Sequence, residues 1–133
     1  MVLPGVQALF GFQFIAVFNR SFELRLTFGE QCLHLAALVL VTIAAGLIMA
    51  PAALHRHLGP REGTERFLRV GGRLLLASLP PLILGIGIDF YIIAHMVLGE
   101  AKYAAVASAV LGSFLVACWF VFPRIYRRRY HPR

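Results

Sequence analysis

The chain has 133 residues, of which 59% are hydrophobic and 14% are charged, and its formal net charge is +7. Its apolar residues gather in four long stretches with short connectors, and this pattern excludes a soluble globular domain. The stretches lie at about residues 2–18, 33–53, 74–95 and 103–122. A bilayer core about 30 Å thick needs roughly 20 apolar residues in a helix, so each stretch predicts a membrane span.

The first stretch contains two polar residues, Gln7 and Gln13. Amide side chains inside membrane helices commonly donate hydrogen bonds to neighbouring helices. We therefore expect both glutamines to contact other helices rather than a ligand.

A basic connector, residues 54–73, follows the second stretch, and a basic tail, residues 123–133, ends the chain. Together they hold ten of the 13 Lys and Arg residues, and Arg20, Arg25 and Lys102 are the other three. Because cytoplasmic segments of membrane proteins collect Lys and Arg, four spans place both termini in the cytoplasm. Nucleic-acid binding is not expected. The arginines predicted to contact lipid phosphates are Arg66, Arg69, Arg73, Arg127 and Arg128.

The third stretch has the most unusual local sequence, Pro80-Pro81, then Gly85 and then Asp89. Two prolines remove two backbone donors and predict a bend or break in the helix. Gly85 predicts close approach of a neighbouring helix.

Asp89 is the acidic residue that lies deep in an apolar stretch, about 22 Å along the helix from Leu74. A charge at such a depth is costly, so Asp89 is a candidate ion- or proton-binding residue. The alternative is a structural ion pair or hydrogen bond. Arg20 and His34, which are predicted near the same outer surface, are its candidate partners.

Two neighbouring stripes of small residues run at i, i+4 spacing along the fourth stretch, one of Ala105, Ala109, Ser113 and Ala117 and a second of Ala104, Ser108 and Gly112. This pattern predicts tight helix contacts within the chain or with another chain. The predicted packing residues here are Ala105, Ala109, Gly112 and Ser113, together with Gly85 of the third stretch.

The histidines and the other polar residues predict no cofactor, metal or catalytic site. His34 and His95 could face each other as haem ligands, but each is expected near a helix end, so no haem or other cofactor is predicted. The sequence contains no metal-binding motif and no nucleophile–base arrangement, so no metal site and no catalytic residues are predicted.

The elements Leu3-Pro4-Gly5-Val6-Gln7, Leu9-Phe10-Gly11-Phe12, Arg20-Ser21-Phe22 and the segment 50–56 resemble a domain-of-unknown-function family. Its members are small four-helix bacterial membrane proteins, and some carry the label sodium:proton antiporter. The resemblance covers most of the chain and implies a bacterial inner-membrane location. Members usually have a charged N-terminal extension before the Leu-Pro-Gly element, which this sequence lacks.

The sequence therefore predicts a single all-α domain, a bundle of four transmembrane helices with antiparallel neighbours. The first functional hypothesis is a non-enzymatic subunit or accessory protein that packs against itself or another membrane protein. The second is a small proton- or cation-coupled transporter that uses Asp89. An interrupted helix and a buried carboxylate favour the second, whereas the small-residue stripes favour the first.

Overall fold

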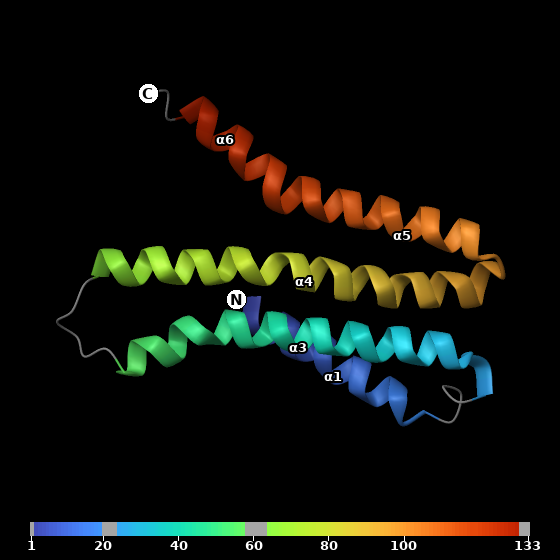
Figure 1. Ribbon diagram of the computed structural model, residues 1–133. Coiled ribbons are helices and arrows are strands. Elements are labelled where there is room, and N and C mark those ends of the chain that lie inside the picture. Colours follow the sequence, from blue (N-terminus) through green and yellow to red (C-terminus); the bar gives the residue numbers. More distant parts are fainter. Residues whose placement is uncertain (1, 20–23, 58–63, 131–133) are drawn as a thin grey trace.

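The computed structural model describes residues 2–19, 24–57 and 64–130, without the side chains of residues 2, 3, 55–57, 64–67 and 127–130. Its elements are all helical (Figure 1): α1 (Val2–Val17), α3 (Phe28–His57), α4 (Thr64–Leu98), α5 (Ala101–Val116), the π-helix η1 (Ala117–Val121) and α6 (Phe122–Tyr130). The last three follow one another directly and form one long helical segment. The predicted all-α fold is confirmed.

Three segments are long and apolar enough to cross a membrane, namely Phe28–Leu54, Leu68–Leu98 and Ala101–Tyr126. Pro4–Val17 is a shorter apolar helix. At 1.5 Å per residue the 16 residues of α1 reach about 24 Å, less than a typical bilayer core. The fold is therefore three helices of membrane-spanning length and a shorter fourth.

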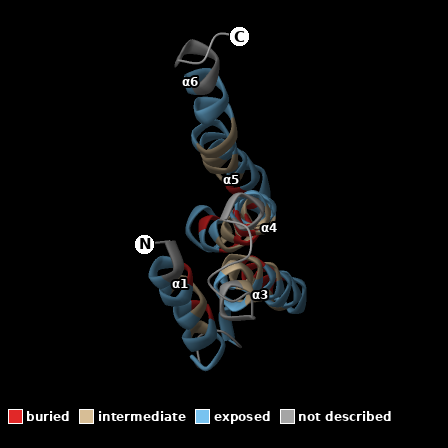
Figure 2. Ribbon diagram, turned by 90° about the vertical axis from the view of Figure 1, so that its left-hand side faces the viewer, coloured by how far each residue is buried: buried red, intermediate tan, exposed pale blue. Residues whose placement is uncertain are grey.

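The long helices α3 and α4 form an antiparallel pair at the centre of the structure (Figure 1). Helix α1 packs on α3, and α5 packs on α4. Towards the C-terminus α5 and α6 diverge from α4 (Figure 1). Most buried residues lie where α1, α3 and α4 face one another (Figure 2), and Val6, Val41, Ala44 and Leu82 form the core cluster there.

Helix α3 begins with a capping box, in which Thr27 and Glu30 satisfy each other's backbone groups. The Thr27 amide donates to Glu30 Oε2 at 2.8 Å, and the Glu30 amide donates to Thr27 Oγ1 at 3.4 Å. At the other end of the pair, Gly99 terminates α4 with a φ of +73°. Glycine adopts this left-handed conformation without steric strain, so α4 ends there and α5 turns back at once.

The predicted interruption of the third helix is wrong, because α4 runs without a break through Pro80 and Pro81. Each proline removes one backbone donor, but the residues after them, Leu82 and Ile83, are buried and hold the chain in place. The departure from α-helical geometry lies instead in η1. Its wide turn comes just before Pro123, which cannot donate to the carbonyl of Trp119.

Candidate functional site

Three polar side chains from three helices meet in the apolar part of the structure: Gln13 of α1, His34 of α3 and Asp89 of α4. Gln13 lies seven residues after Val6, on the same face of α1, and both are buried. The antiparallel register of α3 and α4 places His34 opposite Asp89. Gln13, His34 and Asp89 form the polar trio.

Three contacts join the members of the trio. The Nδ1 atom of His34 lies 2.9 Å from Asp89 Oδ1, and Gln13 Nε2 donates to Asp89 Oδ2. The other ring nitrogen of His34, Nε2, lies 3.2 Å from the backbone oxygen of Gln13. The side chains of His34 and Asp89 are only 9% and 16% exposed, so these contacts replace water almost completely.

Both ring nitrogens of His34 thus face hydrogen-bond acceptors. Two protonation states satisfy this geometry, because a neutral imidazole donates from one nitrogen and an imidazolium from both. Either His34 is an imidazolium beside a carboxylate, or neutral His34 accepts at Nδ1 from a protonated Asp89. In both states a single proton lies between Nδ1 and Oδ1, and the pair has no net charge.

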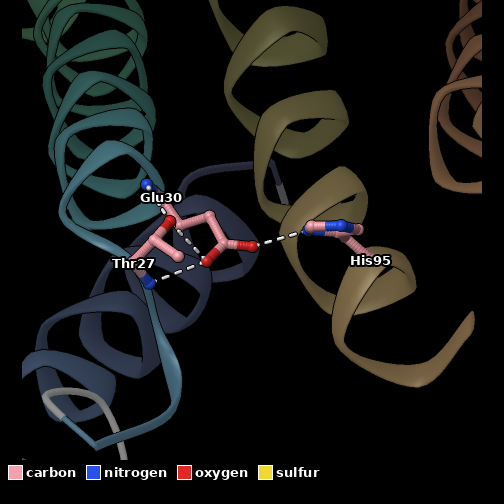
Figure 3. A network of polar contacts seen from close by, with 3 residues as sticks. All are labelled: Thr27, Glu30 and His95. Atoms are coloured by element: carbon pink, nitrogen blue, oxygen red, sulfur yellow. Dashed lines mark hydrogen bonds and ion pairs between the residues drawn. The ribbon is translucent and has the colours of Figure 1, made fainter. Parts of the chain in front are cut away.

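A second carboxylate–imidazole pair lies about one helical turn nearer the N-terminus of α3 and consists of Glu30 of α3 and His95 of α4. His95 Nδ1 lies 2.7 Å from Glu30 Oε1 (Figure 3). The other carboxylate oxygen, Oε2, accepts hydrogen bonds of 2.8 Å from both the amide and the hydroxyl of Thr27 (Figure 3). The His95 side chain is 32% exposed and reaches solvent, whereas the Glu30 side chain, at 11%, is as enclosed as those of His34 and Asp89. In the first pair α3 supplies the imidazole and α4 the carboxylate, whereas in the second pair α3 supplies the carboxylate and α4 the imidazole.

A cavity of about 300 Å³ adjoins the polar trio, and all three members of the trio line it. The other lining residues are apolar and come from α1, from α4 and from Leu26 before α3. An apolar cavity with a few converging polar groups is the usual form of a small-molecule site.

One buried acceptor in the described part of the chain lacks a hydrogen-bond partner, the Oε1 atom of Gln13. Its amide nitrogen is used by Asp89. A buried polar atom without a partner costs about 1–3 kcal/mol. The trio therefore has an excess of acceptors.

The structure brings together two of the three predicted ion-site residues, Asp89 and His34. Arg20, the third, lies outside the described residues. The Gln13 contact agrees with the expectation that this glutamine bonds to a neighbouring helix, whereas Gln7 is exposed. His34 and His95, the two histidines considered as haem ligands, each face a carboxylate.

The predicted packing residues divide into two groups. Gly85 is buried, and a Cβ atom on it would lie 2.8 Å from Val41 Cγ2 and 3.2 Å from the carbonyl oxygen of Ala37. Ala105, Ala109 and Ser113, by contrast, are exposed, and Gly112 has no neighbour within 4 Å of such an added atom. They do not form the contact between α5 and α4.

Helix α5 instead contacts α4 through Ala104 and Ser108 of the second small-residue stripe, but not through its third member, Gly112. Ala104 is fully buried, and Ser108 Oγ donates to the carbonyl oxygen of Gly87 at 2.6 Å. The two stripes have almost the same composition and lie side by side on one helix. Which of them faces α4 follows from the rotation of α5, which the sequence pattern does not determine.

Two of the five predicted lipid-contact arginines, Arg69 and Arg73, have described side chains, and both are exposed. The side chains of Arg66, Arg127 and Arg128 lie outside the described residues. The sequence reasoning missed Glu30 and His95. The available signal was the capping-box pattern from Thr27 to Glu30, which marks where α3 begins but not which residues of α4 lie opposite.

Comparison with known proteins adds a family but no function. No curated protein and no solved structure matches the chain. A family profile covers residues 1–123, including every member of the polar trio and of the second pair. The expected membership of a domain-of-unknown-function family is thereby confirmed: the chain belongs to the family of unknown function DUF6328.

Proposed function

We propose that this protein is a small proton- or cation-coupled transporter of the bacterial inner membrane, with Asp89 and His34 as its proton-binding pair. The observation that carries the proposal is the 2.9 Å contact between these residues beside a cavity, on helices long enough to cross a membrane. Ionisable residues at such depth are costly and mark ion and proton pathways.

The geometry suits reversible proton binding. The pair holds one proton between Nδ1 and Oδ1, and removing it leaves a carboxylate facing a ring lone pair. Adding a second proton leaves a net positive charge in a low-dielectric region. Both changes are unfavourable unless another charge enters or leaves, so proton movement at this pair is coupled to movement of another ion.

The second pair lies between the polar trio and the end of the bundle. His95 is partly open to solvent, Glu30 beside it is buried, and His34 follows Glu30 by one turn of α3. A proton that leaves Asp89 and His34 therefore has titratable groups along its path outwards. In this proposal His95 exchanges protons with water, and His34 and Asp89 bind them.

Proton flux in reconstituted vesicles tests the proposal. Vesicles are loaded at low pH, and release of protons is followed with an internal pH dye after external Na⁺, K⁺ or an alkylammonium ion is added. We expect Asp89→Asn to fold and to lose at least about 90% of the flux. A tenfold loss of this kind corresponds to about 1.4 kcal/mol. Asparagine cannot take part in proton exchange.

Glu100→Gln is the matched control, because Glu100 is an exposed acid paired with Lys102 at 2.8 Å. Its flux should equal that of the unsubstituted protein. Flux no greater than in protein-free vesicles with every cation, or unchanged flux in Asp89→Asn, would overturn the proposal.

A second candidate function is assembly with another copy or with a different membrane protein. The observation that favours it is the exposed small-residue stripe of α5, which includes Ala105, Ala109 and Ser113. Small residues let two membrane helices approach closely.

If that stripe is an interface, Ala109→Leu should dissociate the complex, because the larger side chain prevents close backbone approach. Native mass measurement from nanodiscs reports the change. Ala36→Leu, an exposed alanine on α3, is the control and should leave the assembly intact. Equal masses for all three proteins would show that α5 faces lipid.

The orientation is a further part of the proposal. Reporters fused after Arg133 and inserted beside Gly59 should both read cytoplasmic, because ten of the 13 basic residues lie in the connector and tail. Arg69 and Arg73 then face the phosphates of the inner leaflet. A periplasmic reading from either reporter would contradict this orientation.

A further inference from the structure

We infer that the cavity beside the polar trio binds an apolar primary amine, whose ammonium group takes the place of the proton held by His34 and Asp89. This inference rests on the proposed proton-binding role of that pair and assigns the cation that exchanges with the proton.

The size and walls of the cavity favour an organic ligand. An engineered apolar cavity of about 150 Å³ accommodates benzene, so a cavity of about 300 Å³ accommodates an aromatic ring with a short alkyl chain. The apolar walls include Leu9, Phe12, Ile92 and Met96. Phe12 is 72% exposed and Met96 is 45% exposed, so the cavity reaches the outer surface of the helices.

The polar end of the cavity favours a hydrogen-bond donor. Each carboxylate offers about four acceptor positions, and Asp89 uses one for His34 and one for Gln13. Gln13 Oε1 is a further acceptor without a partner in the described part of the chain. Both ring nitrogens of His34, by contrast, are already engaged. A primary ammonium supplies three donors and matches this excess of acceptors.

A bare metal ion matches it less well. Alkali and alkaline-earth ions need about six oxygen ligands, and the described residues contain no cluster of three or more His, Cys, Asp or Glu side chains. The apolar walls also cannot solvate the water molecules that such an ion would retain. An ammonium group joined to a hydrocarbon body places its charge at Asp89 and its apolar part against the walls.

The exchange conserves charge. In either protonation state that fits the geometry, the pair before binding has no net charge and holds one proton between Nδ1 and Oδ1. When the ammonium binds Asp89, that proton leaves to water, so His34 is neutral and Asp89 is a carboxylate. The Nε2–H of His34 still donates to the Gln13 backbone oxygen, and its Nδ1 lone pair accepts from the ammonium. One cation enters as one proton leaves, so no additional charge is buried.

Calorimetry on the full chain in nanodiscs tests the inference, with 4-phenylbutylamine as the probe. Titrations in two buffers of different ionisation enthalpy give the number of protons released per amine bound. We expect saturable binding and release of about one proton per amine. The same titration into empty nanodiscs measures partition into lipid.

Two related compounds test the chemistry of the ligand. The neutral 4-phenylbutanol should bind at least about tenfold more weakly and release no proton, because it brings no charge. The trimethylated ammonium analogue keeps the charge but has no donors, and it should also bind at least about tenfold more weakly.

Cavity variants test the place of binding. Ala16→Phe and Ile93→Trp fill the cavity from two different helices and leave the polar trio unchanged. Ile93 is 59% exposed, so its replacement is compatible with folding even if Ala16→Phe is not. Both should weaken amine binding at least about tenfold, whereas Ala36→Phe on the outside of α3 should not.

Equal binding of alcohol and amine without proton release would overturn the inference, as would binding that the cavity variants leave unchanged. These failures differ from failure of the proposed function. If the vesicles release protons with Na⁺ or K⁺ in an Asp89-dependent manner but the amine does not bind, only the identity of the cation is wrong.

Discussion

Asp89→Leu is expected to lower the free energy of unfolding by about 3–5 kcal/mol, the usual effect of removing one partner of a buried ion pair. Leucine removes the partner of His34 Nδ1 and of the Gln13 amide nitrogen, and these polar atoms lie in a largely buried region. Asp89→Asn keeps a hydrogen-bond partner for one of these atoms, so its effect should be about 1–2 kcal/mol. Unfolding in mixed micelles of SDS and dodecyl maltoside measures both changes.

The double variant Asp89→Leu with His34→Leu measures the interaction between these two side chains separately from their interactions with other residues. Replacing both partners of a buried pair by apolar residues is often neutral, whereas replacing one is not. The double variant should therefore be more stable than the sum of the two single changes predicts, by at least about 1 kcal/mol. Strictly additive effects would mean that His34 is not the principal partner of Asp89.

The class of fold could be predicted from sequence because hydrophobicity alone determines it. Runs of apolar residues as long as 33–53 and 74–95 have few alternatives to membrane-length helices. The helices extend beyond those runs, to Phe28–His57 and Thr64–Leu98, because helical hydrogen bonding continues past the apolar part. Hydropathy therefore indicates where a helix is apolar but not where it ends.

Asp89 could also be identified from sequence, because the cost of burying a charge does not depend on the rest of the fold. The residues that contact Asp89 could not be identified from the sequence. Their identity depends on the register between α3 and α4 and on the rotation of α1. Both follow from packing between residues far apart in the chain, such as Val41 and Leu82.

The second pair shows the same limitation. Glu30 and His95 each lie near a helix end, where charged residues are ordinary, so neither stands out in the sequence. Only the register makes them neighbours. In the same way, a proline pair predicted a bend or break at Pro80, but α4 is continuous there.

Gly85→Ala is expected to destabilise the protein by about 1–3 kcal/mol through overpacking between α3 and α4. The added Cβ would lie 2.8 Å from Val41 Cγ2, and Val41 is fully buried and has no space to move into. The carbonyl oxygen of Ala37, 3.2 Å away, belongs to the backbone and cannot rotate aside. The same contact lies one turn from His34 and Asp89, so separating the helices here should also lengthen their 2.9 Å contact.

Gly46→Ala is the matched control for Gly85→Ala, since Gly46 is also inside a helix but has nothing within 4 Å of the added atom. It should stabilise the protein by about 0.5–1 kcal/mol, because alanine favours the helix over glycine. Adding Val41→Ala to Gly85→Ala should recover part of the lost stability by vacating the space that the new methyl group needs. If Gly85→Ala is as stable as Gly46→Ala, the two central helices do not approach as closely as this register requires. The position of His34 relative to Asp89 would then need another explanation.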